Sequence, residues 1–318
     1  MKKTILVAGS LNMDMVMEMA RMPAVGETIL GDTLSYVPGG KGANQACTVA
    51  KLGGRAVMLG CVGRDDFGES LRGNLAAAGV EVSKLKTGES STGAASIYVD
   101  GAGNNSIVVI RGANEECDIS YIDQNDSLLR QCSYVMLQME IPYETIFYVI
   151  KKAKEYGKVV ILNPAPAPGP GAIPEEIYKK IDFITPNETE LKTLTGVPDC
   201  GRESLEKGAG LLLEKGVGNV MVTLGEQGAV LVNAQGSMYF PAMRTMAVDT
   251  TAAGDCFNGA FVTALADDMA VPEAIRFANA AASVAVSRKG AQSSIPSAEE
   301  VQRVLAEAKH NDDNKVTV

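Results

Sequence analysis

The chain has 318 residues, 46% hydrophobic and 21% charged, so it can bury a large core as one domain with or without an appendage. Its net charge of -9 repels phosphate backbones and anionic lipid surfaces, so we expect neither a nucleic-acid nor a membrane partner. No segment reaches the roughly 18–20 apolar residues that span a bilayer. Asp14 ends the first apolar run too early for a signal peptide, so we expect a cytoplasmic protein.

Few residue types are available for acid–base chemistry. The only histidine is His310, in the polar C-terminal tail, so catalysis by a core histidine is excluded and a general base should be a carboxylate. The six cysteines are widely spaced and form no CxxC pair, which argues against a zinc site or a disulfide framework. We expect them to be reduced and mostly buried.

Short β-branched runs alternate with helical stretches along most of the chain. The pattern begins with TILVAG, GANQACTVAKLGG, AVMLGCVG and DFGESLRGNLAAAG, resumes with YVMLQM, ETIFYVIKKAKEYG and KVVILNP, and continues through NVMVTLG. Later helices are predicted to start at Gly254, near Pro272 and near Ser297. This alternation predicts an α/β fold, a doubly wound and mainly parallel sheet flanked by helices.

Two stretches, residues 12–38 and 92–112, interrupt this pattern because neither predicts a helix. The second, TGAASIYVDGAGNNSIVVIRG, predicts two strands around a Gly/Asn turn. We expect the stretches to pair into a small β-sheet lid that excludes water from a site, although an extra hairpin without a gating role is the alternative. The main domain would then comprise residues 1–11, 39–91 and 113–309, followed by a disordered tail at 310–318.

The first glycine cluster, VPGGKGANQA, leads into a helix. Its Lys41 is followed by Gly and not by Ser or Thr, so it is not a P-loop, and the first strand carries no GxGxxG. Lys41 and Asn44 beside bare glycine backbone could hold the hydroxyls of a polyol, with Asn12 and Asp14 supplying further donors and acceptors. A helix-entry turn with a solvated lysine is the alternative.

The second cluster, AVDTTAAGDCFNGAF, places Gly254 and Asp255 at the start of a helix of small and apolar residues. A helix N-terminus offers unpaired N–H groups and a positive dipole end, so the backbone of Ala252, Ala253 and Gly254 can act as an anion hole for a transferring phosphoryl group. Asp255 could accept the proton of an attacking hydroxyl. Judged locally, a helix cap is the alternative for Asp255.

These motifs together resemble the ribokinase/PfkB family of sugar kinases. The similarity runs from GSLNMD at residue 9 to RKGAQSSIP at residues 288–296 and includes GGKGANQA, GESSTG, LNPAPA, TPNETE and TLGEQG. The resemblance implies a ribokinase-like α/β sheet with a small β lid, often shared across a dimer, and ATP-dependent phosphorylation of the 5-hydroxyl of D-ribose. We therefore expect a small sugar and ATP as partners, and a homodimer formed through the lid.

The resemblance also implies roles for individual residues. The residues matched to sugar binding are Asn12, Asp14, Gly40, Lys41, Gly42, Ala43, Asn44, Glu140 and Asp255. Those matched to ATP binding are Asn187, Thr223, Leu224, Gly225, Glu226, Gln227, Gly228, Gly254 and Asn279.

Two cations are implied as well. Asn187 and Glu190 match the NxxE motif that places Mg²⁺ largely through water, an ion that prefers to keep its waters; alone they predict a helix capping box, and the two interpretations are compatible. Potassium is implied at a second site, mostly through backbone carbonyls, at Asp249, Thr251, Ala285, Arg288, Gly290 and Ser294. Taken alone, SRKGAQSS indicates only a polar turn.

Two positions in the second glycine cluster lie close to the predicted base. Position 252 is Ala where much of the wider family has Gly, and Cys256 follows the base directly, where we expect it to pack and not to act as a nucleophile. The predicted mechanism is in-line transfer with Asp255 as base.

Kinases of deoxyribose, fructose or a nucleoside are the nearest alternatives for the function, although the lid offers only Tyr36 and Tyr98 for stacking on a nucleobase. A non-catalytic sugar sensor and a dinucleotide dehydrogenase are more distant ones.

Overall fold

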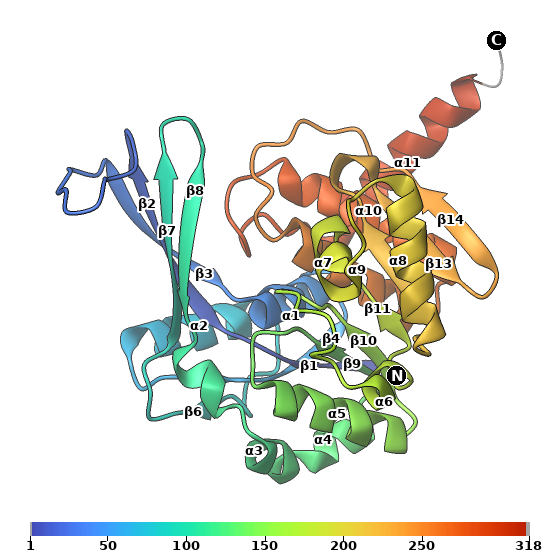
Figure 1. The fold of residues 1–318 in the computed structure, drawn as a ribbon, viewed down its shortest axis with the longest axis horizontal. Helices are drawn as coiled ribbons and strands as arrows, with labels where there is room; N and C mark the ends of the chain where they lie inside the picture. Colours follow the sequence, from blue (N-terminus) through green and yellow to red (C-terminus); the bar gives the residue numbers. More distant parts are fainter. Residues whose placement is uncertain (1, 316–318) are drawn as a thin grey trace.

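The structure is a computed structural model that describes residues 2–315 (Figure 1). Its main domain is built on an eight-stranded sheet in the order β14-β13-β12-β11-β10-β9-β1-β4, in which the strands from β12 to β4 run parallel and β13 and β14 are antiparallel. The strands are β1 (Thr4–Ala8), β4 (Arg55–Leu59), β9 (Tyr134–Leu137), β10 (Val159–Leu162), β11 (Phe183–Ile184), β12 (Asn219–Thr223), β13 (Ala229–Asn233) and β14 (Gly236–Phe240). The predicted fold class is confirmed.

Helices cover both faces of this sheet because successive strand residues point to opposite sides. In β1, Ile5 and Val7 face one core and Leu6 and Ala8 the other. The first core is closed by α1 (Lys41–Lys51), α2 (Asp66–Ala77), α9 (Ala253–Ala266), α10 (Val271–Val286) and α11 (Ala298–Lys315). The second is closed by α3 (Ile119–Gln124), α4 (Asp126–Gln131), α5 (Tyr143–Glu155), α6 (Glu175–Tyr178), α7 (Glu188–Thr195) and α8 (Arg202–Glu214).

The two stretches that interrupt the alternation form one separate sheet, in the order β3-β2-β7-β8. Its strands are β2 (Asn12–Met19), β3 (Thr33–Gly39), β7 (Gly93–Asp100) and β8 (Asn105–Ile110). This sheet, called the lid sheet below, projects from the main domain beside α1 and α2 (Figure 1). The expected pairing of the two stretches is confirmed, whereas the gating role and the exact domain boundaries stay predictions.

The end of the chain differs from the expectation. Helix α11 extends to Lys315 and so continues into the segment 310–318, for which we expected disorder, while residues 316–318 lie outside the described residues. The helix continues because the segment contains neither Pro nor Gly, the residues that most strongly end helices.

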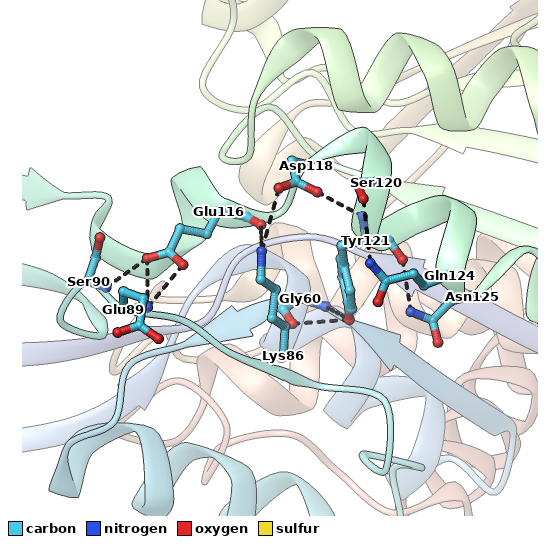
Figure 2. A network of polar contacts seen from close by, with 10 residues as sticks. All are labelled: Gly60, Lys86, Glu89, Ser90, Glu116, Asp118, Ser120, Tyr121, Gln124 and Asn125. Carbon is cyan, nitrogen blue, oxygen red and sulfur yellow. Dashed lines mark hydrogen bonds and ion pairs between the residues drawn. The ribbon is translucent and has the colours of Figure 1, made fainter.

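A polar network ties the base of the lid sheet to the main domain (Figure 2). The Glu116 carboxylate accepts the backbone N–H groups of Glu89 and Ser90, just before β7. Lys86 donates to the Glu116 carbonyl at 2.8 Å, and the Tyr121 hydroxyl accepts the N–H of Gly60 at 3.1 Å. The segments before and after the β7–β8 hairpin are therefore tied to each other through Glu116, and Tyr121 ties the second of them to Gly60, which follows β4.

Helices α1 and α9 pack closely because α9 carries a glycine at the contact. A Cβ on Gly259 would lie 2.5 Å from the Thr48 Cβ and 2.8 Å from the Gln45 carbonyl oxygen. This contact brings the first turns of the two helices, with the residues predicted to bind sugar and to act as base, against each other.

We expect Gly259→Ala to destabilise the protein by about 1–3 kcal/mol, because the added methyl group overpacks the α1–α9 contact. Gly73→Ala in α2 is the matched control: no atom lies within 4 Å of its added Cβ, so the higher helix propensity of Ala should raise stability by about 0.5–1 kcal/mol. Denaturant unfolding measures both, and equal effects of the two variants would contradict the role assigned to the contact.

Candidate active site

The candidate residues gather beyond the carboxyl ends of the parallel strands, where open α/β sheets bind their ligands. Asn12 follows β1, Glu140 follows β9, Asn187 follows β11 and Thr223 ends β12. The first turns of α1 and α9 face this edge. Segments that are far apart in the sequence are therefore brought to one site.

Asp255 lies in the first turn of α9 and is buried, with 7% of its surface exposed. Its Oδ2 accepts a hydrogen bond from Asn44 Nδ2 at 2.9 Å, and its Oδ1 accepts one from Gln45 Nε2 at 3.0 Å. The residue at the N-cap position is Ala252, and no side chain caps the helix. The alternative that Asp255 serves as a helix cap is therefore wrong, because its carboxylate is bound by α1.

The predicted anion hole lies at the start of α9, where one of its three backbone N–H groups is already hydrogen-bonded. Ala252 adopts φ 58°, a left-handed conformation that favours glycine, and much of the wider family has Gly at this position. The Ala253 N–H donates to the Thr250 carbonyl at 3.2 Å, so it is already engaged. Gly254 faces open space, since no atom lies within 4 Å of where its Cβ would be. The bare backbone at Gly254 is thus accessible to a ligand.

On the side of the site predicted to bind the sugar, called the sugar side below, the glycine loop packs on the end of β1 and on Glu140. Glu140 Oε2 accepts the Ser10 hydroxyl at 2.5 Å and the Lys41 backbone N–H at 3.2 Å. Gly40 has φ 90°, and a Cβ there would lie 2.7 Å from the Asn12 nitrogen. Only glycine can hold the loop this close to the strand. Gly42 and Ala43 lie buried at the start of α1.

Acidic groups dominate the electrostatics of this side. Burial, together with the nearby carboxylates of Glu140 and Asp255, raises the pKa of Asp14 to about 7, although Lys41 acts in the opposite direction. Burial lowers the pKa of Lys41, but Asp255, Glu140, Glu190 and Asp14 outweigh it and raise this pKa overall. Lys41 therefore stays charged and partly neutralises the site.

Helix α7 begins with the predicted capping box. The Asn187 side chain accepts the Glu190 N–H at 2.8 Å, and the Glu190 carboxylate accepts the Asn187 N–H at 2.8 Å. Burial raises the pKa of Glu190. One Glu190 oxygen is thus used in the cap and the other remains for a ligand or water.

A pocket of about 380 Å³ lies beside the start of α9, next to Asp255. It is lined, among others, by Asn187, Thr223, Gly225, Gly228, Gly254 and Asn279. A Cβ on Gly228 would lie 2.1 Å from the Phe240 carbonyl oxygen, so the turn at the end of β12 requires glycine there. Leu224, Glu226 and Gln227 do not line the pocket: the first is buried and the other two are exposed.

The residues matched to a second cation site lie on two loops that hold each other. The Asp249 carboxylate accepts the N–H of Thr251 at 2.9 Å and that of Gly290 at 2.8 Å. Burial raises the pKa of Asp249, but these hydrogen bonds lower it by more. The Arg288 guanidinium pairs with Glu300, so only its backbone is free to face the loops. Ala285, in the last turn of α10, and Ser294, in the loop that follows this helix, are buried.

Residues 2–298 match the family described as pfkB family carbohydrate kinase. The chain belongs to this family. It is 39% identical over 309 residues to a ribokinase of Haemophilus influenzae, covering 97% of this chain and 100% of the relative. It is 37% identical over 303 residues to a deoxyribokinase of Salmonella typhi, covering 95% and 98%. The solved ribokinase of Arabidopsis thaliana in complex with ribose and ATP superposes with a TM-score of 0.87 at 34% identity, covering 96% of this chain and 99% of the other.

The PfkB kinase site contains residues that the motifs did not single out. Gln45 binds Asp255 directly, and Gln292 binds Asn44. Asn114, from the segment after the lid hairpin, donates to the Asn12 side chain at 2.8 Å. Gln45 and Gln292 stand in quoted motifs, but a buried glutamine carries no signal of its own in one sequence.

The raised pKa of Asp14 predicts a pH-dependent stability for this kinase without ligand. The unfolded chain ionises Asp14 near 3.8, whereas the folded chain does so near 7, so the stabilising contribution is complete below pH 3.8 and is lost as the pH rises through 7. Asp14→Asn cannot ionise. The Tm of Asp14→Asn minus the Tm of the protein with Asp14 should therefore be about 3 °C larger at pH 8 than at pH 5. The exposed lid residue Asp32, changed to Asn, serves as control, and a pH-independent Tm difference for Asp14→Asn would contradict the assignment.

Proposed function

We propose that this PfkB kinase transfers the γ-phosphoryl group of ATP to the 5-hydroxyl of D-ribose, giving D-ribose 5-phosphate and ADP. The observation that carries the proposal is the buried Asp255 carboxylate, held by Asn44 and Gln45 between a polar sugar-side loop and the pocket beside α9. The similarity to ribokinases over nearly the whole chain supports ribose as the acceptor and ATP as the donor. The deoxyribokinase relative makes 2-deoxyribose the second candidate.

In the proposed mechanism, Asp255 accepts the proton of the attacking hydroxyl, a role worth roughly 10²- to 10⁴-fold in rate. The sugar hydroxyls are held by Asn12, Asp14 and Asn44, and the Gly254 N–H stabilises charge on the transferring group. Because the phosphoryl transition state needs little covalent chemistry from the protein, most of the rate enhancement comes from positioning the reactants and stabilising charge.

Magnesium fits the nucleotide side of the site. Among the described residues, no cluster of three or more His, Cys, Asp or Glu side chains could hold a metal ion alone. Magnesium commonly combines one or two carboxylates with substrate phosphates and water, so Glu190 and Asn187 would hold it through water. When bound, the ion would neutralise phosphate charge.

We propose a potassium site at the two loops that carry Asp249 and Gly290, which are joined by a hydrogen bond. The matched residues would offer the Asp249 carboxylate and the backbone carbonyls of Thr251 and Ala285, a set suited to a large monovalent ion. We propose that the ion orders these loops without touching the sugar. A cytoplasmic location accords with six free cysteines, five of them buried. No helix in the described part of the chain is long and apolar enough to cross a membrane.

The test of the function is ADP release over a panel of ribose, 2-deoxyribose, fructose and nucleosides, with and without potassium. We expect ribose to give the highest kcat/KM, and Asp255→Asn to lower kcat by at least ~10³-fold while ribose binding survives. Asp267→Asn, an exposed carboxylate at the far end of α9, is the control. Absence of ribose-dependent ADP release would refute the proposed function, and a preference for 2-deoxyribose would replace it with the second candidate.

We further propose that the lid sheet forms a homodimer. All of β8 is exposed, and the register places Leu34, Tyr36, Val108 and Ile110 on the face opposite to Asp14. These four side chains are each more than half exposed. An apolar sheet face of this kind suits a second copy of the chain, because an exposed strand edge and apolar face otherwise favour aggregation.

We expect Val108→Asp to convert the dimer to a monomer, since it places a charge in the centre of that face. Light scattering after size-exclusion chromatography measures the mass. Met238→Asp, at an exposed apolar position on β14, is the control and should leave the dimer intact. A dimer that survives Val108→Asp unchanged would argue against this interface.

A further inference from the structure

Both oxygens of Asp255 are held by side-chain amides of consecutive residues in α1. Asn44 donates to Oδ2 and Gln45 donates to Oδ1. An ionised carboxylate can only accept hydrogen bonds, so each amide must turn its NH₂ end toward Asp255. The carbonyl ends of the two amides then point away from the base, and each needs a donor because it is buried.

Other side-chain amides supply these donors. Gln292 Nε2 donates to Asn44 Oδ1 at 3.1 Å, and Asn74 Nδ2 donates to Gln292 Oε1 at 2.5 Å. Gln138 Nε2 donates to Gln45 Oε1 at 2.7 Å. Two chains of amides, one from Asn74 through Gln292 and Asn44 and one from Gln138 through Gln45, therefore end on the same carboxylate.

Every amide in these two relays has the same polarity, with its N–H end directed toward Asp255. Such aligned hydrogen bonds polarise one another in a low-dielectric interior. Gln45 and Gln138 are fully buried, and Gln292 is 4% exposed, so water cannot replace a missing partner easily. Turning Asn44 or Gln45 alone would place a carbonyl oxygen against the carboxylate, and turning an outer amide alone would place two carbonyl oxygens against each other.

We propose that Gln292 and Gln138 are positioning residues for phosphoryl transfer, each acting on the base through the α1 amide that it orients. The inference rests on the proposed function, in which Asp255 is the base. Neither residue has a hydrogen bond to Asp255 within the described residues. The relays hold the Asp255 carboxylate in one orientation through hydrogen bonds to both of its oxygens.

The outer relay also connects two parts of the molecule. Gln292 lies between Gly290 and Ser294, in the loop that follows α10, and Lys51 of α1 donates to the Gln292 carbonyl at 2.7 Å and to the Ile295 carbonyl at 3.2 Å. The loop is thus fastened to the same helix that carries Asn44. A displacement of this loop would therefore move the Asn44 amide, which binds the base Asp255.

The sharpest test replaces the donor by an acceptor. In Gln292→Glu the new carboxylate accepts from Asn44, which turns its carbonyl oxygen toward Asp255 and favours protonation there. We expect kcat at pH 7 to fall about 10- to 100-fold and the acidic limb of the kcat–pH profile to move up by about one pH unit, with the KM for ATP within about twofold. Gln292→Met removes the donor without inverting the relay, so its loss of kcat should be smaller.

Ser293→Ala is the matched control, because Ser293 is exposed in the same loop and bonds only to the Lys289 carbonyl. Its kcat and pH profile should match those of the unchanged enzyme. If Gln292→Glu does not fold, Asn74→Asp carries the test, since a partly exposed Asp at the outer end accepts from Gln292 and inverts the same relay. An unshifted acidic limb in the folded acceptor variant would overturn the proposal.

A second measurement does not depend on activity. The decrease in Tm caused by Gln292→Glu is measured in two backgrounds, the protein with Asp255 and the Asp255→Asn variant. The side-chain amide introduced in the second background can pair with either end of the Asn44 amide. We expect the loss to be at most about half as large in Asp255→Asn. Equal Tm losses in the two backgrounds would mean that Gln292 only fills space, and would overturn the relay. If instead the Tm loss is smaller in Asp255→Asn but the enzyme does not phosphorylate ribose, only the proposed function is refuted.

Discussion

The close contact between α1 and α9 is the constraint on which the site depends. Gly259 lets the two helices approach until Thr48 and the Gln45 backbone fill the position of a side chain. At this separation Asn44 and Gln45 reach the buried carboxylate of Asp255. A buried carboxylate without such donors would cost several kcal/mol, so the helix packing and the hydrogen bonds stabilise each other. The same contact sets the sugar-side loop beside the start of α9.

The acidity of the sugar side follows from this crowding. Asp14, Glu140 and Asp255 are close enough for the latter two to raise the Asp14 pKa, and Lys41 offsets only part of their charge. A site of this kind favours neutral, hydroxyl-rich ligands that donate hydrogen bonds to carboxylates. The features predicted to bind an anion lie on the other side of Asp255, at the bare backbone of Gly254 and the pocket beside it. The two halves of the site would thus differ in the charge they accept, as a phosphoryl transfer between a sugar and a nucleotide requires.

The lid sheet is connected to the site through shared residues as well as through its anchoring network. Asn12 and Asp14 begin β2, and Asn114, just after the lid hairpin, binds both the Leu11 backbone and the Asn12 side chain. Any movement of the lid sheet relative to the main domain would therefore displace residues that are predicted to bind the sugar. The Glu116 and Tyr121 contacts restrict such movement at the base of the hairpin.

The sequence by itself determined the alternation of strands and helices, the separate lid sheet, the exclusion of histidine catalysis and the motifs around Asp255, because periodicity, glycine spacing and residue type are local properties. It left open whether Asp255 caps its helix, and it missed Gln45, Gln292 and Asn114. It also predicted disorder where α11 continues. Only the tertiary structure decided these points, because the role of a buried amide depends on its hydrogen-bond partners, which lie up to 248 residues away in the sequence. Partners at that separation leave no local sequence pattern.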